Sequence, residues 1–348
     1  MTINDIARLA GVSIATVSRV INQKGYVKEE TRRRVEEVIA AQGFRPNAAA
    51  RSLICSNSSM IALIMSERPS SFSLKIINAI EERAAKQKDS VLLYNTGADV
   101  NRELEAISQA IEHRVKGILF LPVMGSGEET VELLKKAEKE DVPVVLLNWD
   151  LYAEDFDCVQ LDNKKIIYDG VTLLAEEGHR RIAYISCPEV AKKGEQRKDG
   201  YVQYLRERKI PIRKEYLYDG QFDEQSGYEA CRKFFSLPKP PTGVLSSCSS
   251  ITLGCFRYLN EQHLVLGKEV GLVGFDDISL VRFLGCPVTA MEQPIRELGE
   301  NACDLLYLRI NGAGKGEIRR KMILGSRIIR RGSEGICCAN CAADRADE

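Results

Sequence analysis

The sequence predicts a small all-α head followed by an α/β body of two doubly wound parallel-sheet lobes. The first 45 residues contain three stretches of helical apolar spacing, separated by Gly and by capping residues. From residue 60 onward, short runs rich in Val, Ile and Leu alternate with amphipathic stretches, as in parallel sheets covered by helices on both faces. About ten such runs are too many for one regular sheet, so we expect two lobes after the head.

Composition indicates a soluble globular protein. Hydrophobic residues make up 44% of the 348 residues and charged residues 28%. No apolar run approaches the ~18 residues that a membrane span requires, and the N-terminus lacks a signal-peptide pattern, so we expect a cytoplasmic protein. The 11 Cys residues are scattered through expected strands and helices, which favours reduced thiols over a disulfide framework.

Two short helices joined by a tight turn are predicted at the start of the head. Thr2 can cap the first helix, Gly11 ends it, and Ser13 can cap a second helix that begins at Ile14. A third helix is predicted over 29–42, before a Gly, and the whole is typical of a helix-turn-helix. The residues expected in its small core are Ile3, Ile6, Ala7, Ala10, Val17, Val20, Ile21, Val35, Val38 and Ile39.

The outer face of the second helix has the chemistry of a DNA-reading surface. Arg19 can donate two hydrogen bonds to guanine, and Ile14 and Ala15 can contact thymine methyl groups. Hydroxyl and amide groups for phosphates or base edges come from Thr16, Ser18 and Asn22. The alternative is a plain solvated helix, which explains less well why this face lacks Lys and Glu.

Charge is distributed unevenly although the net charge is zero. Residues 1–55 carry nine Lys/Arg and five Asp/Glu, whereas the remaining residues carry 40 and 44. A basic head on a mildly acidic body favours a head that meets an anion such as DNA.

The stretch TINDIARLAGVSIATVSRVINQKGYVKEETRRRVEEVIAAQGFRPNAAARSL, residues 2–53, resembles the head of the lac repressor/GalR (LacI) family of bacterial transcription regulators. The resemblance implies base contacts from Ile14, Ala15, Ser18 and Arg19, and phosphate contacts from Thr2, Thr16, Asn22 and Tyr26. It also implies a repressor that binds a pseudo-palindromic operator as a homodimer. Lys28 stands where the family often has a capping Ser, which should weaken the third helix by around 1 kcal/mol.

Residues 46–59 are expected to link the DNA-binding domain, residues 1–45, to the body. Asn47 can cap a helix of one or two turns, which is marginal by itself in water. In the family this segment is a hinge helix that forms on operator DNA, and Leu53 matches the residue that wedges into the minor groove. Judged without the resemblance, a linker is the better interpretation.

The family resemblance also implies that the body, residues 60–333, is built like a periplasmic sugar-binding protein. Such a body has two lobes, and the chain crosses between them three times. We place the crossings near Val159, Met291 and Met322. The lobe next to DNA then comprises 60–158 and 292–320, and the far lobe 159–290 and 322–332. Residues 334–348 are expected to form a disordered Cys-containing tail.

A small-molecule effector is expected between the lobes, because ligands of open α/β sheets bind beyond the carboxyl ends of strands. Arg197 and Asp276 match the family's effector pocket best, with a structural ion pair as their alternative. Core packing is an equal alternative for the aromatic candidates. The full set of candidates is Phe72, Ser73, Trp149, Arg197, Phe222, Ser249 and Asp276, with Asn148, Asp150 and Asp277 also at strand ends.

Two departures put the usual sugar effector in doubt. Ser249 stands where the family often has a carboxylate or amide. Residues 164–167, Lys-Lys-Ile-Ile, stand where the family usually has small residues. The effector is therefore expected to be related to a carbohydrate, but held by a different set of contacts from that of an ordinary sugar.

No motif indicates catalysis, a cofactor or a metal. The Cys337, Cys338 and Cys341 cluster has no nearby His and falls short of a four-ligand zinc site. His179 follows a Gly at a helix end, where a structural role is the default, and no catalytic constellation appears. The remaining alternative is a regulator of the same fold with a degenerate cleft, constitutive or controlled by a protein partner.

Overall fold

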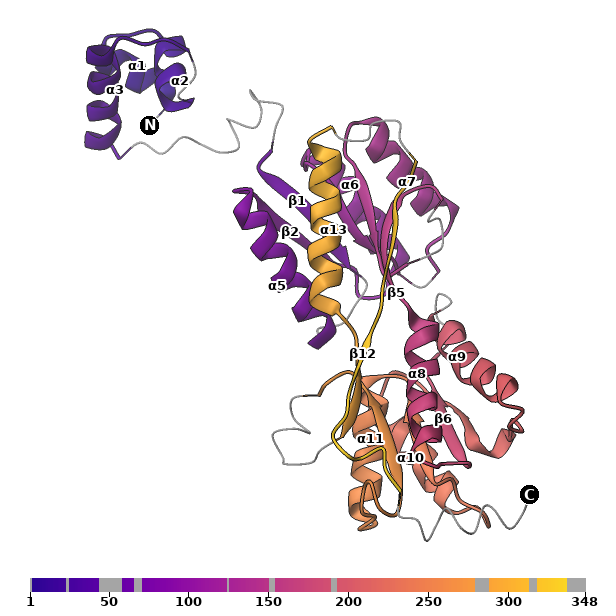
Figure 1. Cartoon of the computed structure of the whole chain (residues 1–348). Coiled ribbons are helices and arrows are strands. Elements are labelled where there is room, and N and C mark those ends of the chain that lie inside the picture. Colours follow the sequence, from indigo (N-terminus) through magenta and orange to yellow (C-terminus); the bar gives the residue numbers. More distant parts are fainter. Residues whose placement is uncertain are drawn as a thin grey trace. The chain divides into compact units, whose positions relative to one another are not determined.

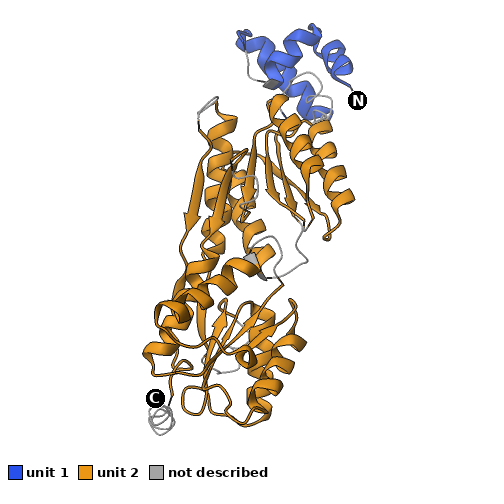
Figure 2. Ribbon diagram, turned by 90° about the vertical axis from the view of Figure 1, so that its right-hand side faces the viewer, with its two compact units in different colours: residues 1–58 blue, residues 59–348 orange. Residues whose placement is uncertain are grey.

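In the computed structural model of the protein, the described residues are 2–22, 25–43, 58–65, 71–123, 125–149, 154–188, 193–278, 288–312 and 318–336. The chain divides into two compact units, Met1–Ser58 and Ser59–Glu348, coloured separately in Figure 2. Within the described residues, no helix is long and apolar enough to cross a membrane.

The first unit holds the predicted helix-turn-helix head (Figure 1). Thr2 and Asp5 form a capping box at the start of α1, and Gly11 ends this helix in the left-handed region, with φ 64°. Ser13 accepts a hydrogen bond from the Thr16 amide at 3.1 Å and so caps α2 as predicted. Lys28 gives α3 no side-chain cap. The helices are α1 Ile3–Ala10, α2 Ile14–Asn22 and α3 Glu29–Ala41.

One small core holds the three head helices together. Its buried members are Ile6, Ala7, Ala10, Val17, Val20 and Val35, with Ile3, Val12, Ile21, Val27, Val38 and Ile39 against them. The apolar spacing read from the sequence therefore identified the inner face of each helix.

The second unit contains two six-stranded sheets, as the α/β prediction requires. All neighbouring strands in the N-terminal lobe are parallel, in the order β11-β5-β4-β3-β1-β2. Its strands are β1 Met60–Met65, β2 Ser90–Asn95, β3 Ile118–Leu121, β4 Val144–Leu147, β5 Asp157–Leu161 and β11 Lys321–Leu324. Its helices are α5 Ser71–Lys86, α6 Val100–Glu112, α7 Glu128–Lys139 and α13 Ile295–Ile310.

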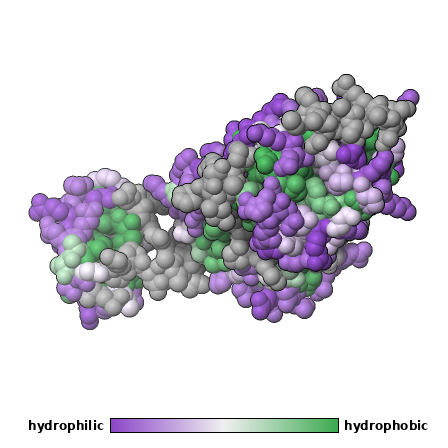
Figure 3. Space-filling view, turned by 90° about the horizontal axis from the view of Figure 1, so that it is seen from below, coloured by the Kyte–Doolittle hydropathy of each residue, from purple (hydrophilic) through white to green (hydrophobic). Residues whose placement is uncertain are grey.

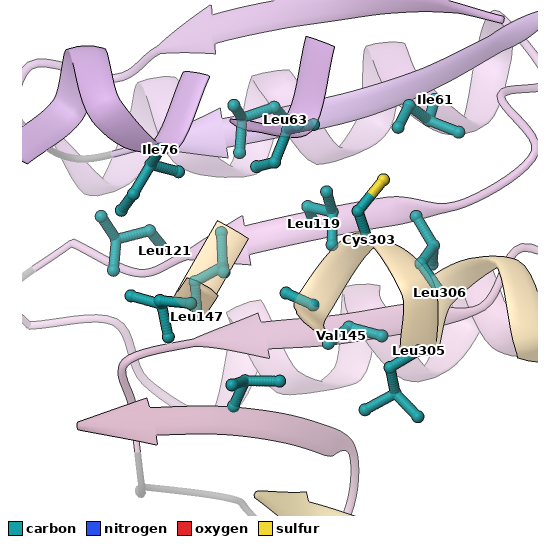
Figure 4. Packing of buried hydrophobic residues seen from close by; sticks show 14 of the residues in the cluster. Ile61, Leu63, Ile76, Leu119, Leu121, Val145, Leu147, Cys303, Leu305 and Leu306 are labelled. Atoms are coloured by element: carbon teal, nitrogen blue, oxygen red, sulfur yellow. The ribbon is translucent and has the colours of Figure 1, made fainter. Parts of the chain in front are cut away.

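Helices cover both faces of this sheet. Helices α5 and α13 bury one face, where side chains such as Leu63, Leu119 and Leu306 meet (Figure 4). Helices α6 and α7 bury the other face, around Ile107, Phe120 and the other members of a second core. Burial on both faces explains why the strands read as continuous apolar runs.

The C-terminal lobe repeats the architecture with the order β12-β10-β9-β8-β6-β7, in which only β12 is antiparallel to its neighbour. Its strands are β6 Ile182–Ser186, β7 Leu217–Asp219, β8 Gly243–Ser246, β9 Gly271–Phe275, β10 Thr289–Glu292 and β12 Arg327–Ile329. Its helices are α8 Asn163–Glu176, α9 Lys193–Glu207, α10 Glu224–Phe235 and α11 Ser249–Glu261, with a 3-10 turn at Lys214–Tyr216.

The three crossings between the lobes lie slightly later in the chain than expected. Val159 and Met322 are paired with each other inside the N-terminal sheet, and Met291 lies inside the C-terminal sheet. Each strand completes its ladder before the chain crosses. The crossings therefore follow β5, β10 and β11.

The body also extends past residue 333, where the tail was expected to begin. The Ser333 hydroxyl donates to the Leu272 carbonyl at 2.6 Å, and Glu334 is only 3% exposed. The Glu334 carbonyl lies 3.0 Å from Nε2 of His179, which is fully buried. His179 is structural as predicted, and Cys337, Cys338 and Cys341 lie outside the described residues.

Candidate functional sites

Helix α2 turns the predicted reading face outward from the head. Ile14 is 50% exposed and Arg19 is exposed, whereas Val17 and Val20 on the opposite side are buried. Ala15 is exposed as well. The predicted base-contact residues of this helix therefore share an accessible surface.

The predicted phosphate-contact residues differ in how available they are. Tyr26 is 87% exposed. The Thr2 hydroxyl donates to the Asp5 carboxylate at 2.9 Å, and this capping box lowers the pKa of Asp5. The Thr16 hydroxyl lies 2.9 Å from that of Ser13. A phosphate would have to share or displace these hydrogen bonds.

Three candidate DNA contacts cannot be placed. The Asn22 side chain, Asn47 and Leu53 lie outside the described residues. Their roles stay predictions.

In the C-terminal lobe, the strand order reverses between β6 and β8, because β7 pairs on the other side of β6. Ligands of open α/β sheets bind beyond the carboxyl ends of the strands at such a point. Ile185 and Ser246 are register partners here, and the chain continues to the buried thiols of Cys187 and Cys248. The candidate pocket is built around this point.

Arg197 of α9 lies at the reversal point with its guanidinium held rigidly. Its Nε donates to Asn163 Oδ1 at 3.0 Å, and Nη1 donates to the Ser247 carbonyl at 2.8 Å. The guanidinium carbon lies 4.2 Å from the centre of the Phe275 ring. The side chain is 7% exposed.

Asp276 follows β9 directly, in the left-handed region with φ 61°. Its Oδ1 accepts a hydrogen bond from Gln293 Nε2 at 2.9 Å. Burial raises the pKa of Asp276, while the Gln293 hydrogen bond and the charges of Arg197 and Lys75 oppose this rise. The charge of Arg197 acts on Asp276, so the two candidates form one electrostatic cluster. That this cluster binds an effector stays a prediction.

Lys75 is a member of this cluster that sequence reasoning missed. It lies on α5 in the N-terminal lobe, yet its charge acts on Asp276 of the C-terminal lobe. The sequence feature that could have identified Lys75 is its position near the start of a helix, two residues after the candidate Ser73. Ser73 itself is buried and Phe72 is half-buried.

Trp149 lies in the core of the N-terminal lobe. It is 6% exposed and lines a small hollow together with Phe120, Phe156 and Ser126. Among the described residues, its indole Nε1 has no hydrogen-bond partner. Trp149 thus packs with the core of this lobe, and its role as a wall of the effector pocket stays a prediction.

Other strand-end candidates have ordinary structural partners. Asn148 Oδ1 accepts from the Leu161 amide at 3.4 Å, and Asp277 pairs with Arg331 at 2.9 Å. Asp150 lies outside the described residues.

Phe222 is the candidate least like a pocket wall, because it is 54% exposed. Ser249 is half-buried as the first residue of α11.

Residues 164–167 form the first turns of α8 and face different surroundings. Ile166 and Ile167 are buried in the core of the C-terminal lobe, and Lys165 pairs with Asp169 at 2.8 Å. These isoleucines are therefore core residues of this lobe.

The fold and the two sites define a helix-turn-helix head joined to a two-lobed ligand-binding body. Residues 2–47 match the model for bacterial regulatory proteins of the lacI family, and residues 58–329 match that for periplasmic binding proteins and the sugar-binding domain of the LacI family. The chain belongs to the LacI family of bacterial transcription regulators.

Named relatives agree with this assignment. The HTH-type transcriptional repressor PurR of Mannheimia succiniciproducens is 31% identical over 89% of this chain and 92% of its own length. Catabolite control protein A of Priestia megaterium is 30% identical over 89% of this chain and 93% of its own length. Transcriptional repressors of this kind are not enzymes.

Solved structures show the same architecture. The lac repressor dimer bound to operator and an anti-inducer superimposes with a TM-score of 0.84 and 25% identity, covering 96% of this chain and 99% of that one. The transcriptional regulator CelR in complex with cellobiose gives a TM-score of 0.69 at 25% identity, with the same coverage.

Proposed function

We propose that this protein is a repressor that binds a pseudo-palindromic operator as a homodimer, without catalytic activity, in the cytoplasm. The observation that carries the proposal is the outward face of α2, where Ile14, Ala15 and Arg19 are exposed on a capped and packed head. A recognition helix in this setting reads base edges in the major groove. A twofold dimer then requires two half-sites related by twofold symmetry.

The proposed hinge supports binding by the head. Residues 46–53 would become helical on operator, and Leu53 of each subunit would open the central base step. An apolar wedge costs unstacking energy but bends the DNA and so enlarges the contact. Operators with a flexible central step should therefore be preferred.

The proposed effector binds between the lobes on Arg197 and Asp276. Arg197 offers the N–H donors of its guanidinium, while Asp276 offers carboxylate oxygens as acceptors, a pair suited to the vicinal hydroxyl groups of a carbohydrate-related molecule. Because the cluster draws on both lobes, a ligand there favours one lobe arrangement over another. This differential affinity would be transmitted to the operator.

Selection of bound fragments from genomic DNA tests the DNA-binding proposal. We expect recovered fragments to share a twofold-symmetric motif, with footprints on both half-sites. Fragments without a common motif would contradict sequence-specific binding.

Thermal-shift measurements with sugars, sugar phosphates, nucleosides and purines test the effector proposal. A ligand of the folded body must raise the melting temperature, and Asp276→Ala should abolish the shift. A body that responds to none of these classes would instead support a degenerate cleft controlled by a protein partner.

A further inference from the structure

Glu103 differs from the other buried carboxylates among the described residues. Asp89 pairs with Lys116, Asp157 with Arg309, and Glu334 with Arg330. Glu103 is 0% exposed, and no cation contacts it within the described part of the chain. A buried carboxylate without a cation is costly, so such a group is retained where it serves a site.

The Glu103 carboxylate instead collects three neutral donors from one stretch of chain. Its Oε2 accepts from the Val123 amide at 2.6 Å. Its Oε1 accepts from the Ser126 hydroxyl at 2.7 Å and from the Thr130 hydroxyl at 2.9 Å. Burial raises the pKa of Glu103, and these hydrogen bonds partly oppose the rise. The carboxylate ties α6 to both ends of the link between β3 and α7.

The same carboxylate reaches the first turn of helix α7. Its N-cap, Gly127, offers no side chain to the free amides of the first turn. Thr130 in that turn is bonded to Glu103. A negative charge near a helix N-terminus is stabilised by the helix dipole, which offsets part of the cost of burying the carboxylate.

The stretch that Glu103 holds lies where a ligand of the N-terminal lobe would bind. The strand order of this lobe reverses between β1 and β3, and the held stretch begins at the carboxyl end of β3. Ser126 and Thr130 line the same hollow as Trp149. Two of the hydrogen-bond donors to Glu103 thus line the same hollow as Trp149, the candidate wall residue of this lobe.

We propose that Glu103 is a positioning residue of the effector pocket, which fixes Val123, Ser126 and Thr130 and, through them, the side chain of Trp149. This inference rests on the proposed effector function. Glu103 touches no ligand in this account. It sets the shape of the N-terminal wall.

Trp149 makes the proposal measurable, because it is the only Trp in the chain. We would measure acrylamide quenching of its fluorescence in full-length wild type and in Glu103→Ala. The quenching constant should rise about twofold in the variant, since a released link exposes the indole. Glu105→Ala, which removes an exposed carboxylate from the same helix, should leave it unchanged. Wild-type quenching in folded Glu103→Ala would overturn the proposal.

A milder variant keeps the test decisive if Glu103→Ala does not fold. Glu103→Gln preserves the shape but replaces one acceptor oxygen with a donor that faces other donors. Hydrogen exchange of the Val123–Thr130 peptide should accelerate about tenfold in this variant. Unchanged exchange would refute the anchoring role.

Titrations with D-ribose and with cellobiose separate this inference from the effector proposal. If neither sugar nor the wider thermal-shift panel affects wild type, the effector proposal fails, while the quenching and exchange results still decide whether Glu103 positions Trp149. If one sugar binds, Glu103→Gln should weaken it about tenfold and leave ligand-free operator affinity unchanged. Unaltered sugar affinity would remove Glu103 from the pocket.

Discussion

Replacing Arg19 with Ala isolates base reading from head stability. No hydrogen bond or ion pair involving Arg19 is found among the described head residues, and its side chain is exposed. Removing it should therefore change the stability of the head by less than about 0.5 kcal/mol. The whole effect then falls on binding. A bidentate contact to guanine contributes about 1–3 kcal/mol, so a dimer with two such contacts should lose about 2–6 kcal/mol on its best operator.

Fluorescence anisotropy at several salt concentrations is the appropriate assay, on the selected operator and on a scrambled duplex. Arg19→Ala should lose affinity for the operator, relax the preference at one guanine in each half-site, and keep most of its affinity for scrambled DNA. Arg33→Ala removes another exposed charge, which pairs with Glu37 on α3, and serves as the control. An equal loss on both duplexes, with a salt slope reduced by about 0.9 per lost contact, would mean that Arg19 contacts only phosphate.

Three further predictions concern packing, pH and the hinge. In Gly254→Ala, the new Cβ would lie 1.9 Å from the Glu224 carbonyl oxygen, so helices α10 and α11 must move apart. Calorimetry should show that the free energy of unfolding falls by about 1–3 kcal/mol or more. Wild-type stability would contradict such close packing of the two helices. Burial lowers the pKa of His179 below its ordinary value of 6.5. Because the unfolded chain therefore binds more protons, the melting temperature should fall as pH drops below 6.5. If the melting temperature of His179→Gln depends on pH to the same extent, His179 is excluded as the source. Leu53→Ser should weaken specific binding by a few kcal/mol and abolish the DNA bend. If the variant bends the operator fully in a bending assay, residues 46–59 are a plain linker.

Local patterns were sufficient to predict the head and the strand-helix alternation. The start of α2 at Ile14 follows from Ser13 as a cap and from the spacing of Val17 and Val20, which all act within one or two turns. The apolar runs of the body likewise report burial on both sheet faces. The positions of the crossings depend on ladders between distant strands, such as the pairing of Val159 with Met322. Their placement from sequence was therefore a few residues early.

The candidate pocket was predicted only in part, for the same reason. Arg197 and Asp276 follow recognisable strand and loop patterns. Lys75 acts on Asp276 across about 200 residues of sequence, and Glu103 bonds Val123 and Thr130 from another helix. Whether an aromatic residue lines a pocket or the core also depends on tertiary packing, which buries Trp149 and leaves Phe222 exposed.

In the proposed mechanism, a ligand held by Arg197 and Asp276 controls the affinity of the head for its operator. The most direct test measures operator affinity of the full-length dimer with and without the compound that most raises its melting temperature. Wild type should change affinity by about 5- to 150-fold, the range of ordinary allosteric coupling. Asp276→Asn, which keeps an oxygen acceptor for Gln293, should bind operator as wild type does without the compound and should not respond to it. An equal response in wild type and in Asp276→Asn would contradict the account.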